Sequence, residues 1–200
     1  MLAIETQNII FINYNKIWLF FQKNFCTALN FTMIQQHLSG SSSFNQNWTM
    51  FKLGFGNTSA DYWIGNDRLN ILTKSGLFRL YVELQATDQL WSYVWYNTFI
   101  IGNESTGYQL QVGGYSGSGG GPGNSLASSG STALNGMKFS TMDVDNDQNG
   151  SNCAISKGGG FWYNSCTAAC VNCAGSNFVW NNMLSGHNNL MLSRMYLILK

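Results

Sequence analysis

Alternation of apolar and polar residues in the middle of the chain predicts a half-buried strand. In "LFRLYVELQATD" (77–88), apolar side chains occupy every second position from residue 78 to residue 84. This is the two-residue period of a strand that turns one face toward a core. The next segments, 90–102 and 107–117, have the same character, so we expect them to be its neighbours in an antiparallel meander. Further strands are predicted at the beginning of 31–44 and in the last segment, 189–200.

Two short helices are predicted between these strands. In "NWTMFKLGFG" (47–56), three aromatic residues have helical spacing and a glycine ends the pattern. In "DRLNILTKSG" (67–76), two leucines lie three residues apart, and Gly76 is suited to the C-terminal cap. The chain therefore mixes strands with a few short helices.

Two segments have no clear period. Residues 1–30 are apolar and irregular, with one candidate strand in "KIWLFF" (16–21). The segment 117–136 is rich in glycine and serine, and we interpret it as a mobile loop within the domain because its two flanks belong together.

Composition narrows the class of protein. The 200 residues suffice for one domain with a sizeable core. Charged residues make up 10% of the chain, against roughly 25% in an average soluble domain. The net charge of +1 provides no large field that would attract nucleic acid or an anionic membrane. No apolar run approaches the roughly 18 residues of a membrane span, so we expect neither partner.

The chain gives weak signals of secretion. Asn-x-Ser/Thr sequons occur at Asn30, Asn47, Asn57, Asn103 and Asn149, and such sequons are used on surface loops of secreted proteins. The apolar N-terminal segment is interrupted by asparagines and a lysine, and no small-x-small cleavage site follows it, so it does not read as a clean signal peptide.

The stretch "DVDNDQNGSNCA" (143–154) is a candidate metal loop. Asp145, Asp147 and Asn149 alternate and a glycine follows, as in the first half of an EF-hand loop. The second half fails, because position 12 is Ser156 instead of a bidentate glutamate. Alternating carboxylates on a turn can still converge on one hard cation, with main-chain carbonyls as further ligands. A solvated acidic turn is the alternative.

Cysteine spacing also leaves alternatives open. Five cysteines leave an odd one after complete pairing within the chain. In "CTAACVNC", Cys166, Cys170 and Cys173 would form a zinc site with His187 or Cys153 as fourth ligand. Disulfide bonds are the other interpretation.

Residues 135–166, "NGMKFSTMDVDNDQNGSNCAISKGGGFWYNSC", resemble the C-terminal half of the fibrinogen-like domain, the globular module of fibrinogen, ficolins and tachylectins. Upstream, "FTMIQQHLSGSSSFNQNWTMFKLGFGN" and "YWIGNDRLNILT" resemble the family's W-T-V-I-Q-R-R and F-W-L-G-N-D segments. The resemblance covers residues 31–200, with 1–30 as a divergent segment. It implies an α+β fold: a twisted antiparallel sheet, short helices and a loop-rich, calcium-binding C-terminal subdomain from about residue 135 to 200.

The resemblance implies a Ca²⁺ site and a disulfide. Asp145 and Asp147 would supply side-chain oxygens, and the carbonyls of Asn149 and Ser151 would complete the site with water. Asp143 also falls on the motif, and we assign it a structural role. Cys153 and Cys166 correspond to the family's C-terminal disulfide, which would contribute roughly 2–4 kcal/mol.

The resemblance also implies a ligand pocket beside the metal. In ficolin-like and tachylectin-like members, main-chain N–H groups, here those of Ser165, Cys166 and Thr167, bind an acetyl oxygen. Aromatic rings enclose the methyl group, and Trp162 and Tyr163 are the candidates here, with burial in the core as the alternative. The peptide before the second cysteine is often cis in the family.

This chain departs from the pattern around that pocket. Thr167 replaces the usual histidine, and Lys157 stands where a pocket tyrosine is common. The segment "AACVNCAG" (168–175) replaces a longer stretch of the pocket wall.

Two functions follow as expectations. The first is a secreted, calcium-dependent, lectin-like module that recognises acetylated glycans in innate immunity. The second is a structural module that binds a peptide or a receptor protein. A homo-oligomer would add avidity to either. Neither a nucleophile motif nor a phosphate-binding loop occurs in the sequence, so we expect no enzymatic activity.

Overall fold

The computed structural model describes residues 3–6, 9–14, 17–22, 25–29, 31–38, 44–117, 122–181, 183 and 188–200, with side chains from residue 31 onward. Its centre is a seven-stranded sheet with the order β10-β9-β8-β15-β5-β7-β6, in which all neighbouring strands are antiparallel. The strands are β5 (Phe31–Leu38), β6 (Phe55–Gly56), β7 (Tyr62–Trp63), β8 (Phe78–Ala86), β9 (Trp91–Ile101), β10 (Leu110–Gly117) and β15 (Leu190–Leu199).

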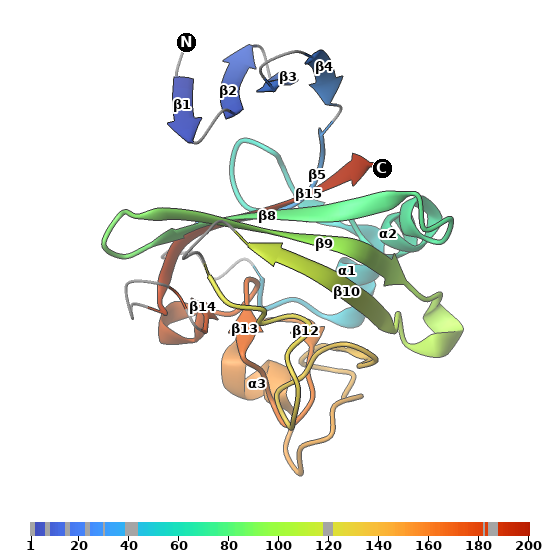
Figure 1. Cartoon of the computed structure of the whole chain (residues 1–200). Coiled ribbons are helices and arrows are strands. Elements are labelled where there is room, and N and C mark those ends of the chain that lie inside the picture. Colours follow the sequence, from blue (N-terminus) through green and yellow to red (C-terminus); the bar gives the residue numbers. More distant parts are fainter. Residues whose placement is uncertain are drawn as a thin grey trace.

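The meander predicted from the alternating pattern is confirmed as β8, β9 and β10. The terminal strand β15 does not lie at an edge. It is inserted between β8 and β5, so that the end of the chain completes the centre of the sheet (Figure 1). The central sheet is therefore complete only when β15 has paired with β8 and β5, whose residues lie more than a hundred positions earlier in the chain.

Both faces of the central sheet are covered by apolar side chains. Leu80, Val82 and Leu84 lie on the inner face with no exposed surface, as the alternation predicts. Tyr81, which we expected to face solvent, is also buried, because its ring packs against those of Trp95 and other aromatic residues of neighbouring strands on the outer face. The outer face thus combines an aromatic cluster with charged side chains, since the Tyr196 hydroxyl donates to Glu83, which pairs with Arg194.

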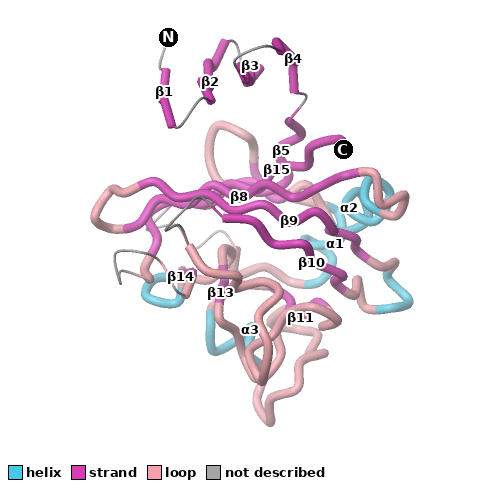
Figure 2. Tube along the Cα trace, viewed as in Figure 1, coloured by secondary structure: helices cyan, strands magenta, loops and turns pink. Residues whose placement is uncertain are grey.

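Two short helices, α1 (Trp48–Leu53) and α2 (Asn66–Thr73), pack against this sheet, and Figure 2 shows α1 below it and α2 at its right-hand end. They confirm the two helices predicted from the sequence. Helix α1 begins at Asn47, whose side chain accepts a hydrogen bond from the Met50 N–H at 3.0 Å, an N-cap that satisfies one of the free donors of the first turn. Helix α2 ends at Thr73 and its C-cap is Lys74, so the prediction of Gly76 as the C-terminal cap is wrong.

The C-terminal subdomain lies on the same side of the sheet as the helices (Figure 1). It contains few regular elements: β11 (Phe139–Ser140) with β12 (Phe161–Trp162), β13 (Ala169–Cys170) with β14 (Val179–Trp180), and the helix α3 (Cys153–Lys157). The subdomain also contains the 3₁₀ turn η2 (Gly175–Asn177), whereas a second 3₁₀ turn, η1 (Glu104–Thr106), lies between β9 and β10. The loop-rich character agrees with the prediction, but the predicted range to residue 200 is too long, because β15 belongs to the central sheet.

The glycine-rich and serine-rich segment is more ordered than its composition suggests. From residue 122 onward it packs on the subdomain, where Leu126 and Leu134 are buried. The indole N–H of Trp180 donates to the carbonyl of Gly123 at 2.9 Å. The prediction of a mobile loop is therefore wrong for 122–136, while 118–121 lie outside the described residues.

The N-terminal segment forms more strands than the single candidate we predicted. A four-stranded antiparallel meander contains β1 (Ala3–Thr6), β2 (Ile9–Tyr14), β3 (Ile17–Gln22) and β4 (Phe25–Leu29). Its short strands are rich in isoleucine and phenylalanine, which favour strands even where the alternation is interrupted. In Figure 1 the meander lies on the opposite side of the central sheet from the C-terminal subdomain.

Among the described residues, none of the helices has the length and apolar character needed to cross a membrane.

Candidate calcium and ligand site

The acidic loop 143–153, called the calcium loop below, is held by hydrogen bonds at both ends. At its beginning, Asn146 donates through Nδ2 to the carbonyl of Phe139 at 2.8 Å, which fixes it to β11. At its end, Asn152 donates through Nδ2 to the carbonyl of Thr141 at 3.0 Å, and its Oδ1 caps α3. These asparagines shape the loop around its acidic residues Asp145 and Asp147.

Asp143 is occupied by contacts within the protein. Its Oδ1 accepts the main-chain N–H of Trp48 at 2.8 Å and the hydroxyl of Thr141 at 2.7 Å. Trp48 is the first residue of α1, whose N–H has no partner inside the helix. Asp143 therefore ties the calcium loop to α1, which agrees with a structural role and not with a ligand role.

Asp145 and Asp147 form the acidic centre of the loop. Asp145 Oδ1 accepts the N–H of Asp147 at 3.2 Å, while the Asp147 carboxylate accepts N–H groups of Asn149 and Cys153, each at 2.8 Å. Burial raises the pKa of Asp147, and the nearby charge of Asp145 adds to this, against the lowering effect of the two N–H donors. The two carboxylates thus repel one another at a site where a cation would offset both charges.

The donor set of the loop fits a calcium ion. The described residues contain no cluster of three or more His, Cys, Asp or Glu side chains that could hold a metal, so two carboxylates need neutral oxygens beside them. The carbonyls of Asn149 and Ser151 accept no hydrogen bond from any described residue, which leaves both oxygens available. A site made only of oxygens, with carbonyl and water ligands, suits Ca²⁺ better than a softer metal.

A disulfide joins the end of the calcium loop to residues 164–167, called the ligand segment below. Cys153 and Cys166 are bonded, with their Cα atoms 5.5 Å apart. The amide nitrogen of Asn149 lies 3.6 Å from one sulfur and 3.5 Å from the other. The disulfide therefore fixes the position of the calcium loop relative to residues 164–167.

Cys170 and Cys173 form a second disulfide. Cysteines in disulfides cannot act as thiolate ligands, so the zinc alternative does not hold for Cys166, Cys170 and Cys173. The remaining zinc candidate, His187, lies outside the described residues, as does the side chain of Cys26.

The predicted acetyl-binding groups are only partly available. The N–H of Ser165 donates to the carbonyl of Ser131 at 3.0 Å. The hydroxyl of Thr167 is engaged with Ala169. Cys166 has a positive φ of 25°, and the described part of the chain has no cis peptide bond, so the expectation of a cis Ser165–Cys166 bond is wrong here. Among the three predicted N–H groups, those of Cys166 and Thr167 have no carbonyl partner within the described residues.

Trp162 and Tyr163 are core residues. Trp162 has 1% of its surface exposed and donates through its indole N–H to the carbonyl of Tyr108 at 2.8 Å. Tyr163 is fully buried, and its hydroxyl donates to the carbonyl of Gly159 at 2.6 Å. This burial favours the core interpretation over contact with a ligand, and the predicted aromatic enclosure of a methyl group is not present at these two rings.

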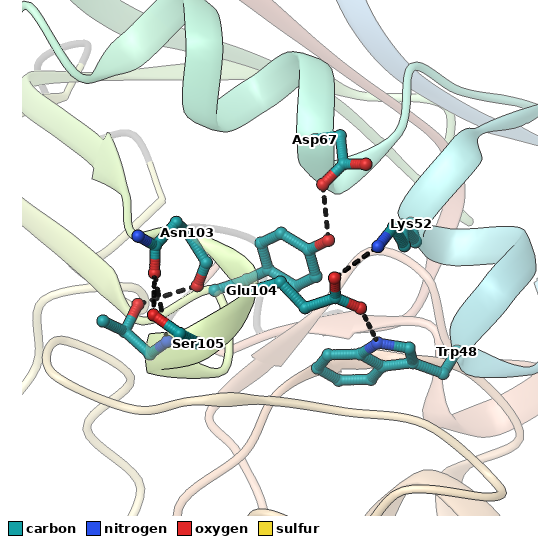
Figure 3. A network of polar contacts seen from close by, with 8 residues as sticks. Trp48, Lys52, Asp67, Asn103, Glu104 and Ser105 are labelled. Carbon is teal, nitrogen blue, oxygen red and sulfur yellow. Dashed lines mark hydrogen bonds and ion pairs between the residues drawn. The ribbon is translucent and has the colours of Figure 1, made fainter.

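A polar network beside α1 was not predicted from the sequence. Glu104 accepts a hydrogen bond from the indole N–H of Trp48 at 2.9 Å and forms an ion pair with Lys52, as Figure 3 shows. Nearby, the hydroxyl of Tyr108 donates to Asp67 at 2.6 Å. Because Trp48 also binds Asp143 through its main chain, this network continues to the calcium loop. No motif connects these residues in the sequence, since they come from α1, α2, η1 and the bend that follows η1.

The contacts of Asp143 lead to a prediction that separates positioning from ligation. We expect Asp143→Ala to lower the free energy of unfolding by about 1 kcal/mol, the usual cost of losing a helix-end acceptor. We expect Asp143→Asn, which keeps the acceptor oxygen, to lower it by less, and calcium to raise the melting temperature of both variants. Thermal unfolding with and without calcium checks this. Complete loss of the calcium effect in Asp143→Asn would make Asp143 a ligand.

The fold and the site together define a class of protein: a domain with a central antiparallel sheet and an acidic loop that is linked by a disulfide to the neighbouring segment. The family model described as "Fibrinogen beta and gamma chains, C-terminal globular domain" matches residues 7–191. The chain belongs to this family. Domains of the family often bind calcium and are not enzymes, which confirms the expectation of no enzymatic activity.

Curated relatives are similar to this chain over 70% of its length. The human fibrinogen alpha chain is 42% identical over 147 residues, which are 70% of this chain and 17% of the relative. Angiopoietin-4 of Bos taurus is 38% identical over 141 residues, or 70% of this chain and 27% of the relative. Fibrinogen-like protein 1 of Rattus norvegicus is 35% identical over 150 residues, or 70% and 47%. The chain therefore spans less than half the length of each of these proteins.

Solved structures confirm the predicted fold. The fibrinogen-like globe domain of human ANGPTL2 superimposes with a TM-score of 0.74 at 27% identity, covering 96% of this chain and 92% of that domain. The lamprey fibrin D-dimer, complexed with the peptide ligand Gly-His-Arg-Pro-amide, has a TM-score of 0.74 at 24% identity and covers 95% of this chain and 64% of its own. The match to the family model begins at residue 7, within the segment that showed no resemblance by sequence motifs.

Proposed function

We propose that this chain is an extracellular, calcium-dependent module that binds a peptide or a protein segment. The observation that carries the proposal is the calcium loop, in which Asp145 and Asp147 stand beside two available carbonyls and a disulfide that leads to residues 164–167. The loop would hold Ca²⁺ through Asp145, Asp147, Asn149 and Ser151. The ion would neutralise the acidic pair and stiffen the loop, and through the disulfide it would order the adjoining ligand surface.

Several features support a peptide over an acetylated glycan. Trp162 and Tyr163 are buried, and the N–H of Ser165 is already used, so the acetyl pocket lacks its aromatic walls and one of its donors. The fold accommodates a short peptide in the lamprey fibrin D-dimer. The N–H groups of Cys166 and Thr167 would then bind a carbonyl or carboxylate of the peptide.

The two disulfides support an oxidising, extracellular location, because such bonds persist in secreted proteins and are rare in the cytosol. A homo-oligomer would increase avidity for a repeated partner. A role in innate immunity belongs to the glycan hypothesis and depends on it.

The proposal is tested by selecting a phage-displayed random peptide library on the immobilised full chain in calcium, with elution by a chelator. We expect enriched peptides that bind in calcium and are released when it is removed. Retention of the protein on an N-acetylglucosamine resin in calcium would favour the glycan hypothesis instead. A folded, calcium-loaded protein that enriches no peptide would contradict the proposal.

A charge-neutral substitution in the loop separates calcium binding from folding. In Asp145→Asn the amide oxygen can still accept the N–H of Asp147, so only the charge is lost. We expect the calcium-dependent rise in melting temperature to disappear while the calcium-free protein keeps its stability. Asp88→Asn is the matched control, because Asp88 Oδ1 accepts the N–H of Leu90 two residues on at 3.1 Å, the same local contact far from the loop in sequence. Equal calcium effects in both variants would contradict the assignment.

A further inference from the structure

The structure sorts the sequons of this chain by the state of their asparagine side chains. Asn-linked glycosylation needs a side-chain amide that reaches the surface and that can carry a bulky sugar in the folded protein. Asn30 lies outside the described residues, and the other four sequon asparagines are all exposed. They differ in what the amide nitrogen contacts.

Asn57 lies in the turn between β6 and β7. Its Oδ1 accepts the main-chain N–H of Ser59 at 2.9 Å, which forms an Asx turn from the two ends of its own sequon. Main-chain hydrogen bonds at 3.0 Å, from Asn57 to Asp61 and from Ala60 to Asn57, close the turn. No hydrogen bond of Nδ2 is found among the described residues, so the amide nitrogen is presented outward on a fixed turn.

Asn103 lies in the turn between β9 and β10, where its side chain caps η1 and also binds its own sequon. Its Oδ1 accepts the hydroxyl of Ser105, the sequon serine, at 2.7 Å and the N–H of Thr106 at 3.2 Å. Figure 3 shows that its amide nitrogen takes part in none of the marked contacts. The sequon hydroxyl therefore fixes the amide oxygen and leaves the nitrogen free.

The remaining two asparagines are engaged differently. Asn149 points its amide nitrogen at both sulfurs of the Cys153–Cys166 disulfide, and its carbonyl belongs to the proposed calcium site. A sugar on that nitrogen would displace it from the disulfide and cover the calcium loop. Asn47 caps α1 through a bond to Met50, three residues on, so its side chain is not held by its own sequon.

We propose that Asn57 and Asn103 carry N-linked glycans and that Asn149 does not. In each modification the amide nitrogen Nδ2 bonds to the anomeric carbon of a lipid pyrophosphate-linked oligosaccharide. The bond from that carbon to the pyrophosphate oxygen breaks, the lipid pyrophosphate leaves with the electron pair, and the amide loses one proton. The inference rests on the secretion included in the proposed function.

The two sites lie at opposite edges of the central sheet. Asn57 belongs to the hairpin of β6 and β7 at one edge, and Asn103 to the hairpin of β9 and β10 at the other. Neither belongs to the calcium loop or to the ligand segment. Glycans at these turns would therefore cover the two edges of the sheet.

The test is site-by-site occupancy of the full chain, expressed behind a secretory leader in mammalian cells. Peptides are released after enzymatic deglycosylation in heavy-oxygen water, which marks each formerly glycosylated asparagine by mass. We expect the mark at Asn57 and Asn103 and an unmodified Asn149. Each of the variants Asn57→Gln and Asn103→Gln should remove one step of gel mobility, whereas Asn149→Gln should remove none.

A glycan at Asn149, or an unmodified Asn57 or Asn103, would overturn the proposal. Occupancy is read from protein inside the secretory pathway as well as from the medium, so a defect in release does not obscure it. Calcium binding by the same protein after deglycosylation is measured separately. A failure of the glycan proposal is therefore distinguishable from a failure of the proposed function.

Discussion

Replacing Trp162 by alanine is expected to remove about 3–5 kcal/mol from the free energy of unfolding, the usual cost of truncating a fully buried aromatic side chain. Trp162 packs between the subdomain and the central sheet, with ring centroids 5.1 Å from Phe139 and 6.3 Å from Phe99. The change also leaves the buried carbonyl of Tyr108 without its indole donor, which adds a further cost. Since small domains have about 5–15 kcal/mol in total, the variant should be largely unfolded at moderate denaturant.

Chemical denaturation of Trp162→Ala measures this, with Trp91→Ala as the matched control. The substitution Trp91→Ala removes the same side chain from a position that is 49% exposed, so the free energy of unfolding should fall only a little. If Trp162→Ala were as stable as Trp91→Ala, Trp162 would not be a core residue, and a role in ligand contact would have to be considered again.

Removing the Cys153–Cys166 disulfide is expected to cost about 3 kcal/mol, the value for closing a loop of this length in the unfolded chain. The bond spans 13 positions. It also holds the end of the calcium loop, where Cys153 donates its N–H to Asp147 and Asn149 packs on the sulfurs. We therefore expect the double variant Cys153→Ser, Cys166→Ser to lose calcium affinity together with stability.

The second disulfide provides the comparison. Cys170 and Cys173 are three positions apart, so removing their bond should cost less in unfolded-chain entropy, about 2 kcal/mol on the same relation. Melting temperatures of the two double variants, each with and without calcium, measure the difference. An equal loss of calcium response in both would show that the Cys153–Cys166 bond has no particular connection to the loop.

The local elements were predictable from the sequence because their signals are local. The alternation in 77–88 depends on which residues face the core, and the helix predicted in 47–56 depends on the spacing of its aromatic residues and on its glycine ending. The position of β15 in the centre of the sheet was not predictable in this way, because no local pattern states which strand lies beside which. The burial of Tyr81 depends likewise on aromatic rings from other strands, on a face that the period-two pattern marks as exposed.

In the candidate site, too, some features were predictable from the sequence and others depend on contacts between distant segments. The stretch 143–154 indicated the acidic residues, and the family resemblance over 135–166 implied the pairing of Cys153 with Cys166, which the structure contains. Neither gave the contact between Asp143 and Trp48 or the network around Glu104, which join segments far apart in the sequence. Trp162 and Tyr163 lie next to the ligand segment in the chain, but adjacency in sequence does not decide whether a ring turns inward. The prediction of a mobile loop in the glycine-rich and serine-rich stretch was wrong for 122–136, because composition alone does not show that Leu126 and Leu134 are buried in the core.

The most direct test of the account is a calorimetric calcium titration of the full chain beside its Asp145→Asn variant. The account predicts one calcium ion per wild-type chain and none bound by the variant, with both proteins folded by circular dichroism. Equal calcium binding by the two proteins, or no binding by a folded wild-type chain, would contradict the calcium loop as the centre of this module.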